Sequence, residues 1–131
     1  MKIVRYKDWR SKKIHYGVII TDKIFYLKNS PFNAVVKINK KKSIKLIEKT
    51  LLPPCDPNTI IALAINYLNP NKKKQIVNEP LIFIKSNNTI CKSNKKIKIA
   101  FNLPTWGESE LGLVIKKQAK NVSIKEAKKY I

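Results

Sequence analysis

Apolar and polar residues alternate along the first thirty positions in the way that short antiparallel strands require. Three such segments lie at residues 3–7, 14–20 and 23–27. A basic stretch at 10–13 separates the first two, and Thr21-Asp22 separates the last two. Polar breaks of this kind between apolar runs are typical of turns. The pattern predicts a small antiparallel β-meander at the amino terminus.

The spacing of apolar residues changes after the meander. Ser43 precedes Ile44, Ile47 and Leu51, which fall on one side of a helix. Serine is a favoured N-cap, so the spacing predicts a short helix over Ile44–Leu51. The Pro-Pro pair that begins at Pro53 ends it and marks a boundary. We expect an amino-terminal β-meander domain at 1–50 and a second domain at 51–131.

The second domain is also rich in predicted strands. They cover Thr59–Ile65, Leu81–Lys85, Lys95–Ala100 and Glu108–Ile115. The first is nearly all apolar, as in a strand buried on both faces. The expected class is therefore mostly β with short helices (α+β).

The last segment predicts a helix that begins close to the end of the sequence. Ser123 and Glu126 have the spacing of a capping box, with serine at the N-cap and glutamate at the third helical position. Barely two turns follow, and short isolated helices are marginal in water. We therefore expect the chain to be the front part of a longer fold, with the apolar faces of its second domain exposed.

The formal net charge of +20 invites a nucleic-acid interpretation, but the residue types weaken it. The basic residues are 26 Lys and only two Arg, and arginine is the side chain that grips guanine edges and phosphate bidentately. Twenty Ile and 13 Asn accompany the lysines, as a general compositional drift would produce. This composition argues against sequence-specific nucleic-acid binding.

The apolar runs and the cysteines indicate whether the protein is membrane-bound, secreted or cytoplasmic. The longest wholly apolar run, Ile60–Ile65, is far shorter than the roughly 20 residues of a membrane helix, so we expect no membrane partner. The first ten residues lack the apolar core of a signal peptide. Cys55 and Cys91 form no CxxC pair, which favours free thiols and a cytoplasmic protein.

Two of the eight acidic residues, Glu108 and Glu110, are two positions apart in a predicted strand. Alternate residues of a strand point to the same side, so both carboxylates would project together. A hard divalent ion such as Mg²⁺ or Mn²⁺ is a usual partner for such oxygen ligands. A solvated strand face balanced by the many lysines is the alternative. Two carboxylates are also fewer than a well-held ion requires.

The order of several segments closely resembles the fumarylacetoacetate hydrolase family. The segments are LLPPCDPNTII at 51–61, INY at 65–67, EPLIFIK at 79–85, WGESELGLVI at 106–115 and AKNVSIKEAKKYI at 119–131. The resemblance implies the beginning of a mixed β-sandwich roll that is truncated here. It also implies metal-dependent hydrolysis or decarboxylation of C–C bonds, or enol isomerisation or hydration, in 2-oxo acids and acylpyruvates. Complete members are expected to be homo-oligomers.

The same resemblance suggests roles for individual residues. Glu108 and Glu110 match two of three carboxylate ligands for Mg²⁺ or Mn²⁺, and the third would lie beyond the capped helix. Lys85 matches a lysine that would lie near the substrate carboxylate; a lysine at a strand end is the alternative. Where the family commonly has a histidine and a glutamate, this sequence has Pro70 and Lys73. Proline has no proton to move, and lysine has the wrong charge to orient a histidine, so we expect no hydrolysis by this chain alone.

Two functional hypotheses remain. The first is the front fragment of a divalent-metal-dependent hydrolase, isomerase or lyase. It would be a truncated chain, the product of a split gene whose carboxy-terminal half is a partner supplied separately, or a decaying copy. The second is a non-catalytic basic domain on the same scaffold that binds polyanions such as nucleic acid.

Overall fold

The computed structural model describes residues 1–32, 35–47, 50–67 and 79–131. The chain divides into two compact units. One consists of Met1–Cys55 and Lys92–Ile131, and the other is Asp56–Cys91. The predicted domain boundary after residue 50 stays a prediction. We describe the amino-terminal sheet, the central hairpin and the carboxy-terminal segment separately.

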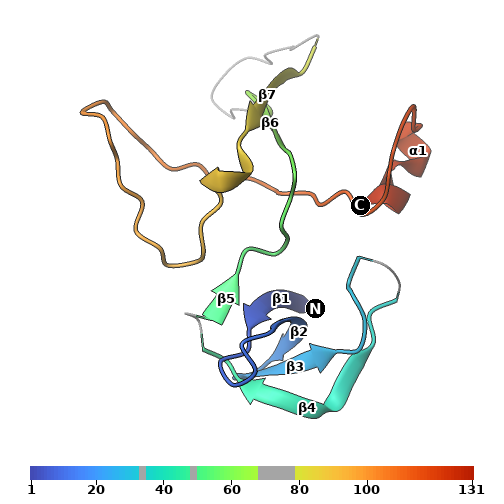
Figure 1. Cartoon of the computed structure of the whole chain (residues 1–131). Coiled ribbons are helices and arrows are strands. Elements are labelled where there is room, and N and C mark those ends of the chain that lie inside the picture. The colour runs from blue at the N-terminus through green and yellow to red at the C-terminus, as the bar shows by residue number, and fades with distance from the viewer. Residues whose placement is uncertain (33–34, 48–49, 68–78) are drawn as a thin grey trace. The chain divides into compact units, whose positions relative to one another are not determined.

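The amino-terminal segment forms a five-stranded antiparallel sheet (Figure 1). Its strands are β1 (Lys2–Lys7), β2 (Ile14–Ile20), β3 (Lys23–Leu27), β4 (Ile38–Lys45) and β5 (Leu51–Leu52). Their order in the sheet is β4-β3-β2-β1-β5, so the first four strands follow one another and the fifth returns beside β1. The predicted meander is therefore confirmed, including its first three strands.

The main core cluster of this sheet, Tyr6, Ile24 and Tyr26, lies on one face and follows from strand register. Ile24 pairs with Ile19 and with Ile44, and directly paired residues of antiparallel strands project to the same side. Tyr6 and Ile24 are fully buried, and Tyr26 is 6% exposed. The rings of Tyr6 and Tyr26 meet edge to face, with their centroids 5.7 Å apart. This contact joins β3 to β1 across the intervening strand β2.

Gly17 in β2 makes this packing possible. A Cβ atom at that position would lie 2.3 Å from Cγ2 of Ile24, 2.8 Å from the carbonyl oxygen of Phe25 and 3.1 Å from Cε1 of Tyr6. The neighbouring strand and the Tyr6 ring therefore occupy the space that any larger residue would need. A glycine within a strand often marks such a close approach.

The helix predicted over Ile44–Leu51 is wrong. Ile44 and Lys45 belong to β4, and Leu51 begins β5. Ile44 pairs with Ile24 across the sheet, so the backbone of its strand is hydrogen-bonded to β3. Hydrogen bonds to a neighbouring strand have overridden a helical spacing that was only local.

The central unit contains an antiparallel pair, β6 (Ile60–Ala64) and β7 (Leu81–Lys85), which confirms two predicted strands. A single-turn 3₁₀ helix, η2 (Asn87–Thr89), follows. The register places four aliphatic side chains on one face, which are Ile61, Leu63, Ile82 and Ile84. All four are exposed, Ile84 by 74%, so the expected exposure of apolar faces is confirmed here.

The segment from residue 92 to residue 131 is almost entirely irregular. The strands predicted at Lys95–Ala100 and Glu108–Ile115 are wrong, because neither range forms a strand. The predicted helix is present as α1 (Ile124–Ala127) and continues as the 3₁₀ turn η3 (Lys128–Tyr130). The regular structure of the described residues is mostly strand in antiparallel sheets, with short helices, as the sequence predicts.

The capping of α1 differs from the predicted box. Ser123 occupies the N-cap position, but its side chain makes no capping hydrogen bond. The Glu126 carboxylate pairs instead with the Lys129 ammonium at 2.8 Å. A glutamate side chain at this position can either accept a hydrogen bond from the N-cap backbone N–H or pair with a lysine one turn later. On this exposed helix it pairs with the lysine.

Candidate functional site

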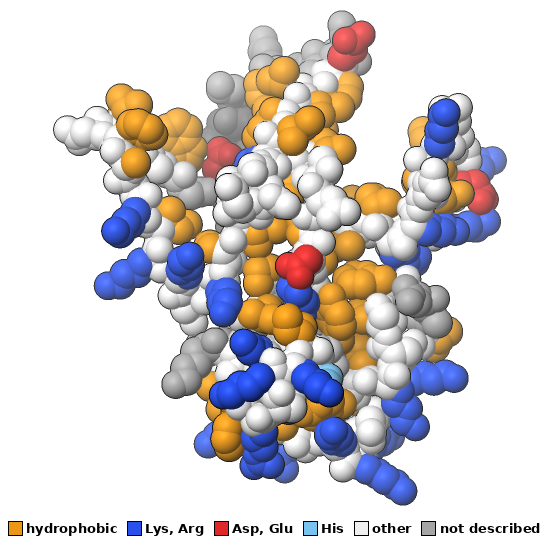
Figure 2. All heavy atoms as spheres, viewed as in Figure 1, with side chains coloured by type: hydrophobic (Ala, Val, Ile, Leu, Met, Phe, Trp, Pro, Cys, Tyr) orange, Lys and Arg blue, Asp and Glu red, His pale blue; other side chains and the backbone are white. Residues whose placement is uncertain are grey.

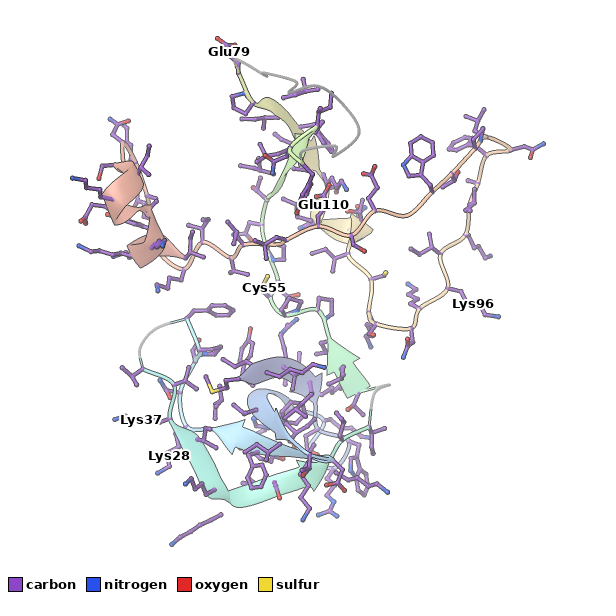
Figure 3. All side chains as sticks on the ribbon, turned by 180° about the vertical axis from the view of Figure 1, so that it is seen from behind. Lys28, Lys37, Cys55, Glu79, Lys96 and Glu110 are labelled. Carbon is purple, nitrogen blue, oxygen red and sulfur yellow. The ribbon has the colours of Figure 1, made fainter. Side chains whose placement is uncertain are left out.

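Glu108 and Glu110 lie on the irregular segment, and both are exposed. Figure 3 labels Glu110. The indole Nε1 of Trp106 donates a hydrogen bond of 3.2 Å to Oε1 of Glu108, so one carboxylate already has a neutral donor beside it. Because the segment is not a strand, the expectation that both side chains share one strand face does not apply. The two carboxylates are close because their residues are two positions apart in the sequence, and no regular element of the described structure holds them together.

The lack of a strand here has a physical cause. The apolar alternation of Leu111, Leu113 and Ile115 fits a strand, but a strand also needs a neighbour for its backbone N–H and C=O groups. Residues 108–115 belong to neither of the two sheets in the described part of the chain. The side chains of Leu111, Leu113 and Ile115 are consequently exposed.

The residues present fit a divalent ion in kind but not in number. Carboxylate oxygens are the ligands that Mg²⁺ and Mn²⁺ prefer. Among the residues that the structure describes, no group of three or more His, Cys, Asp or Glu side chains is placed to hold a metal ion. Glu108 and Glu110 thus provide at most part of a ligand set.

Lys85, the predicted substrate-binding residue, ends β7 and pairs with Ile60. Its side chain is exposed, and its ammonium nitrogen lies 5.6 Å from the centroid of the Phe83 ring. A cation above an exposed ring retains most of its hydration and can still meet an anion. Lys85 belongs to a different compact unit from the two glutamates.

The positions expected to hold a catalytic pair, Pro70 and Lys73, lie outside the described residues. The only histidine, His15, belongs to the meander, where its ring contacts Tyr6 and Tyr26 at centroid distances of 6.0 and 5.0 Å. These contacts make His15 part of the aromatic packing around the core.

Sequence reasoning missed a buried carboxylate in the loop between β1 and β2. Asp8 is 6% exposed, and its Oδ1 accepts a hydrogen bond of 3.0 Å from the backbone N–H of Arg10. Its Oδ2 accepts bonds from the hydroxyls of Ser11 (2.8 Å) and Tyr26 (3.0 Å). The Arg10 N–H and the Ser11 hydroxyl are the main causes that lower the pKa of Asp8 to about 2. The sequence signal that could have identified this role is the position of Asp8 at the start of a polar turn, where aspartate side chains often accept backbone hydrogen bonds.

The two core tyrosines differ in their polar ends. The Tyr26 hydroxyl has Asp8 as its acceptor, whereas the Tyr6 hydroxyl is buried without a hydrogen-bond partner among the described residues. Burial raises the pKa of the Tyr6 phenol well above its usual range, and the neighbouring Tyr26 hydroxyl raises it further. Tyr6 therefore contributes through its ring and not through its hydroxyl.

Two other expectations concern cysteines and membrane spans. Cys55 and Cys91 are free, as predicted. No helix in the described ranges is long and apolar enough to cross a membrane. Neither feature adds a group to the candidate site.

Comparison with known proteins places the chain in a family. The family model described as "Fumarylacetoacetate (FAA) hydrolase C-terminal" matches residues 59–131, more than half of the chain. A fumarylacetoacetate hydrolase domain-containing protein 2 homolog from Dictyostelium discoideum is 35% identical over 102 residues. The match covers 76% of this chain and 33% of that relative, so the chain spans about a third of the relative's length. No solved structure matches. The chain belongs to the fumarylacetoacetate hydrolase family.

Proposed function

We propose that this chain supplies part of a divalent-metal-dependent enzyme that acts on 2-oxo acids or acylpyruvates. Membership of a hydrolase-type enzyme family supports the general class of activity. The observation that carries the metal dependence is the pair Glu108 and Glu110, which lies inside the matched range 59–131. The reaction would be C–C bond hydrolysis, decarboxylation, or enol isomerisation or hydration.

Glu108 and Glu110 are the residues that would hold Mg²⁺ or Mn²⁺. Both carboxylates are exposed, so a metal ion could reach them from solvent. The bond from Trp106 fixes one oxygen of Glu108 and leaves the other for a metal. A bound ion would supply Lewis acidity toward the carboxylate and 2-oxo oxygens of the substrate.

The charge of the chain suits an anionic substrate. Lys85 is exposed at the end of β7, and its ammonium group would meet the substrate carboxylate. The net charge of +20 would attract such substrates from a distance and raise their association rate, an effect that salt would weaken.

Pro70 and Lys73 set a limit on the proposal. Without a histidine and a glutamate at these positions, the chain lacks an evident general base for water. We therefore propose that activity needs the rest of the fold, corresponding to the two thirds of the Dictyostelium relative that lie outside the match. That part of the fold would complete the metal ligands, and the complete protein would be a homo-oligomer of cytoplasmic location.

The test is Mn²⁺ binding by isothermal titration calorimetry. The full chain would be titrated alone and then mixed with the remaining portion of the Dictyostelium relative. We expect weak binding alone and markedly tighter binding by the mixture. Loss of acylpyruvate absorbance, measured with and without Mn²⁺ over a panel of 2-oxo acids, would then identify the substrate.

Single variants connect the result to the glutamates. Glu108→Gln and Glu110→Gln should each remove most of the gain in Mn²⁺ affinity, because an amide oxygen carries no charge. Glu126→Gln is the matched control, since that carboxylate pairs with Lys129. If the first two variants bind Mn²⁺ as tightly as the parent, the metal-site proposal is wrong.

A further inference from the structure

The loop between β1 and β2 presents an aromatic ring among cations. Trp9 is 51% exposed, and Arg10, Lys12 and Lys13 beside it are exposed as well. The Arg10 guanidinium carbon lies 4.9 Å from the centroid of the Trp9 ring. An exposed aromatic ring beside cations offers a flat face on which another ring can stack.

This loop is held in shape from its buried side. The Asp8 carboxylate accepts hydrogen bonds from Arg10, Ser11 and Tyr26. The Asp8 backbone closes the loop as well, donating to the Lys13 carbonyl at 2.9 Å and accepting from the Lys12 N–H at 2.8 Å. A surface that is ordered before it binds loses less conformational entropy on binding.

The surroundings of the loop favour an anionic partner. Residues 1–55 contain 14 Lys and Arg and three acidic residues, which is a net charge of +11. Among the described residues of this sheet, Asp22 is the only exposed acidic side chain, because Asp8 is buried. Figure 2 shows Lys and Arg side chains over much of this part of the molecule.

The lysines 40–42 of β4 form a second cationic cluster, which allows the contribution of charge to binding to be compared with that of an exposed ring. It carries as many cations as the loop, but the nearby ring, that of Tyr26, is 6% exposed and lies 4.6 Å from the Lys42 ammonium. A polyanion could meet this cluster through charge alone. The Asp8–Lys13 loop also offers a flat apolar surface, which calls for a ligand that has flat rings.

We propose that the Asp8–Lys13 loop binds single-stranded nucleic acid, with a base stacked on Trp9 and phosphates at Arg10, Lys12 and Lys13. Base stacking on aromatic side chains together with backbone contacts to cations is the usual mode of such binding, and it tolerates any sequence. The shortage of arginine that argues against sequence-specific recognition is therefore no obstacle. The loop lies outside the matched range 59–131, so this proposal is independent of the metal site.

Fluorescence of Trp9 tests the stacking directly. The full chain would carry Trp106→Phe, which leaves Trp9 as the only tryptophan. A short oligo(dT) should quench the emission, while polyphosphate at equal phosphate concentration should not. Equal responses to both probes would overturn the proposal. A blue shift with phosphatidylserine vesicles and no quenching by oligo(dT) would also overturn it and indicate a membrane surface.

Matched variants then separate this loop from general charge. Trp9→Ala should weaken oligo(dT) binding about tenfold, and Trp9→Phe, which keeps a ring, should restore most of it. The triple change Arg10→Ala, Lys12→Ala and Lys13→Ala should weaken binding more than the triple change to Ala at lysines 40–42. Each triple removes three charges, so equal losses would show that binding is diffuse and would overturn the proposal.

Discussion

Similar apolar patterns occur in the amino-terminal sheet and in the segment from 92 to 131, but they form paired strands only in the sheet. In the sheet, alternating residues pair with neighbouring strands and bury Tyr6, Val18, Ile24 and Tyr26. In the later segment, Ile97, Ile99, Phe101 and Leu103 alternate equally well, yet each is exposed. Alternation thus shows that a stretch can become a strand. A partner strand decides whether it does.

Hydrogen exchange should reveal the largest difference between the two regions. Amides of β2, which is hydrogen-bonded on both sides, should exchange only on global opening, about 10³-fold or more slowly than free peptide. Amides of 97–103 should exchange at nearly the free rate. Mass spectrometry of labelled peptides measures both, and equal protection of the two segments would refute the comparison.

Truncation of isoleucine should cost stability in one region only. Ile24→Ala removes a fully buried side chain and should lower the free energy of unfolding by about 2–5 kcal/mol. Ile99→Ala removes an exposed one and should change it by less than about 0.5 kcal/mol. Urea unfolding followed by circular dichroism gives both values. A comparable loss from Ile99→Ala would mean that this segment packs against something.

Glycines sharpen the same contrast. Gly17→Ala places a methyl group against Ile24 and a backbone carbonyl, and should destabilise the sheet by about 1–3 kcal/mol. Gly112→Ala is the control, since a Cβ there meets nothing within 4 Å. The melting temperature should therefore fall for the first variant and remain near that of the parent for the second. If Gly17→Ala is tolerated, β2 and β3 lie farther apart than described.

Acid should affect the sheet through Asp8. Its pKa is lowered from 3.8 to about 2, so the folded state holds the carboxylate ionised where the unfolded chain takes up a proton. The stability that this contributes, at most about 2 kcal/mol, is complete above pH 4 and is lost as the pH falls through about 2. Asp8→Asn should flatten the acid limb of the stability profile, and Glu126→Gln, which changes an exposed pair, should not.

The local pattern of apolar and polar residues predicts the positions of several strands, but not the elements and sites that depend on contacts between distant residues. The sequence predicts the first three strands of the meander because their turns and alternation are local. It also predicts β6 and β7 as strands, but not that they pair with each other. The helix at 44–51 was wrong because the pairing of Ile44 with Ile24 is a contact between distant residues. Glu108 and Glu110 could be singled out by type and spacing, but not placed, because their surroundings depend on strand pairing. The braced Asp8 loop depends on Tyr26, which is 18 residues away.

The position of β4 also limits how the amino-terminal sheet can grow. This strand lies at the edge of the sheet, and Lys40, Lys41 and Lys42 are all exposed along it. A second strand that approached this edge would have to desolvate three ammonium groups, which is how natural sheets avoid edge-to-edge aggregation. Addition of another strand is therefore directed to the opposite edge, where β5 spans only Leu51–Leu52 and, among the described residues, pairs with only Arg5 and Tyr6 of β1.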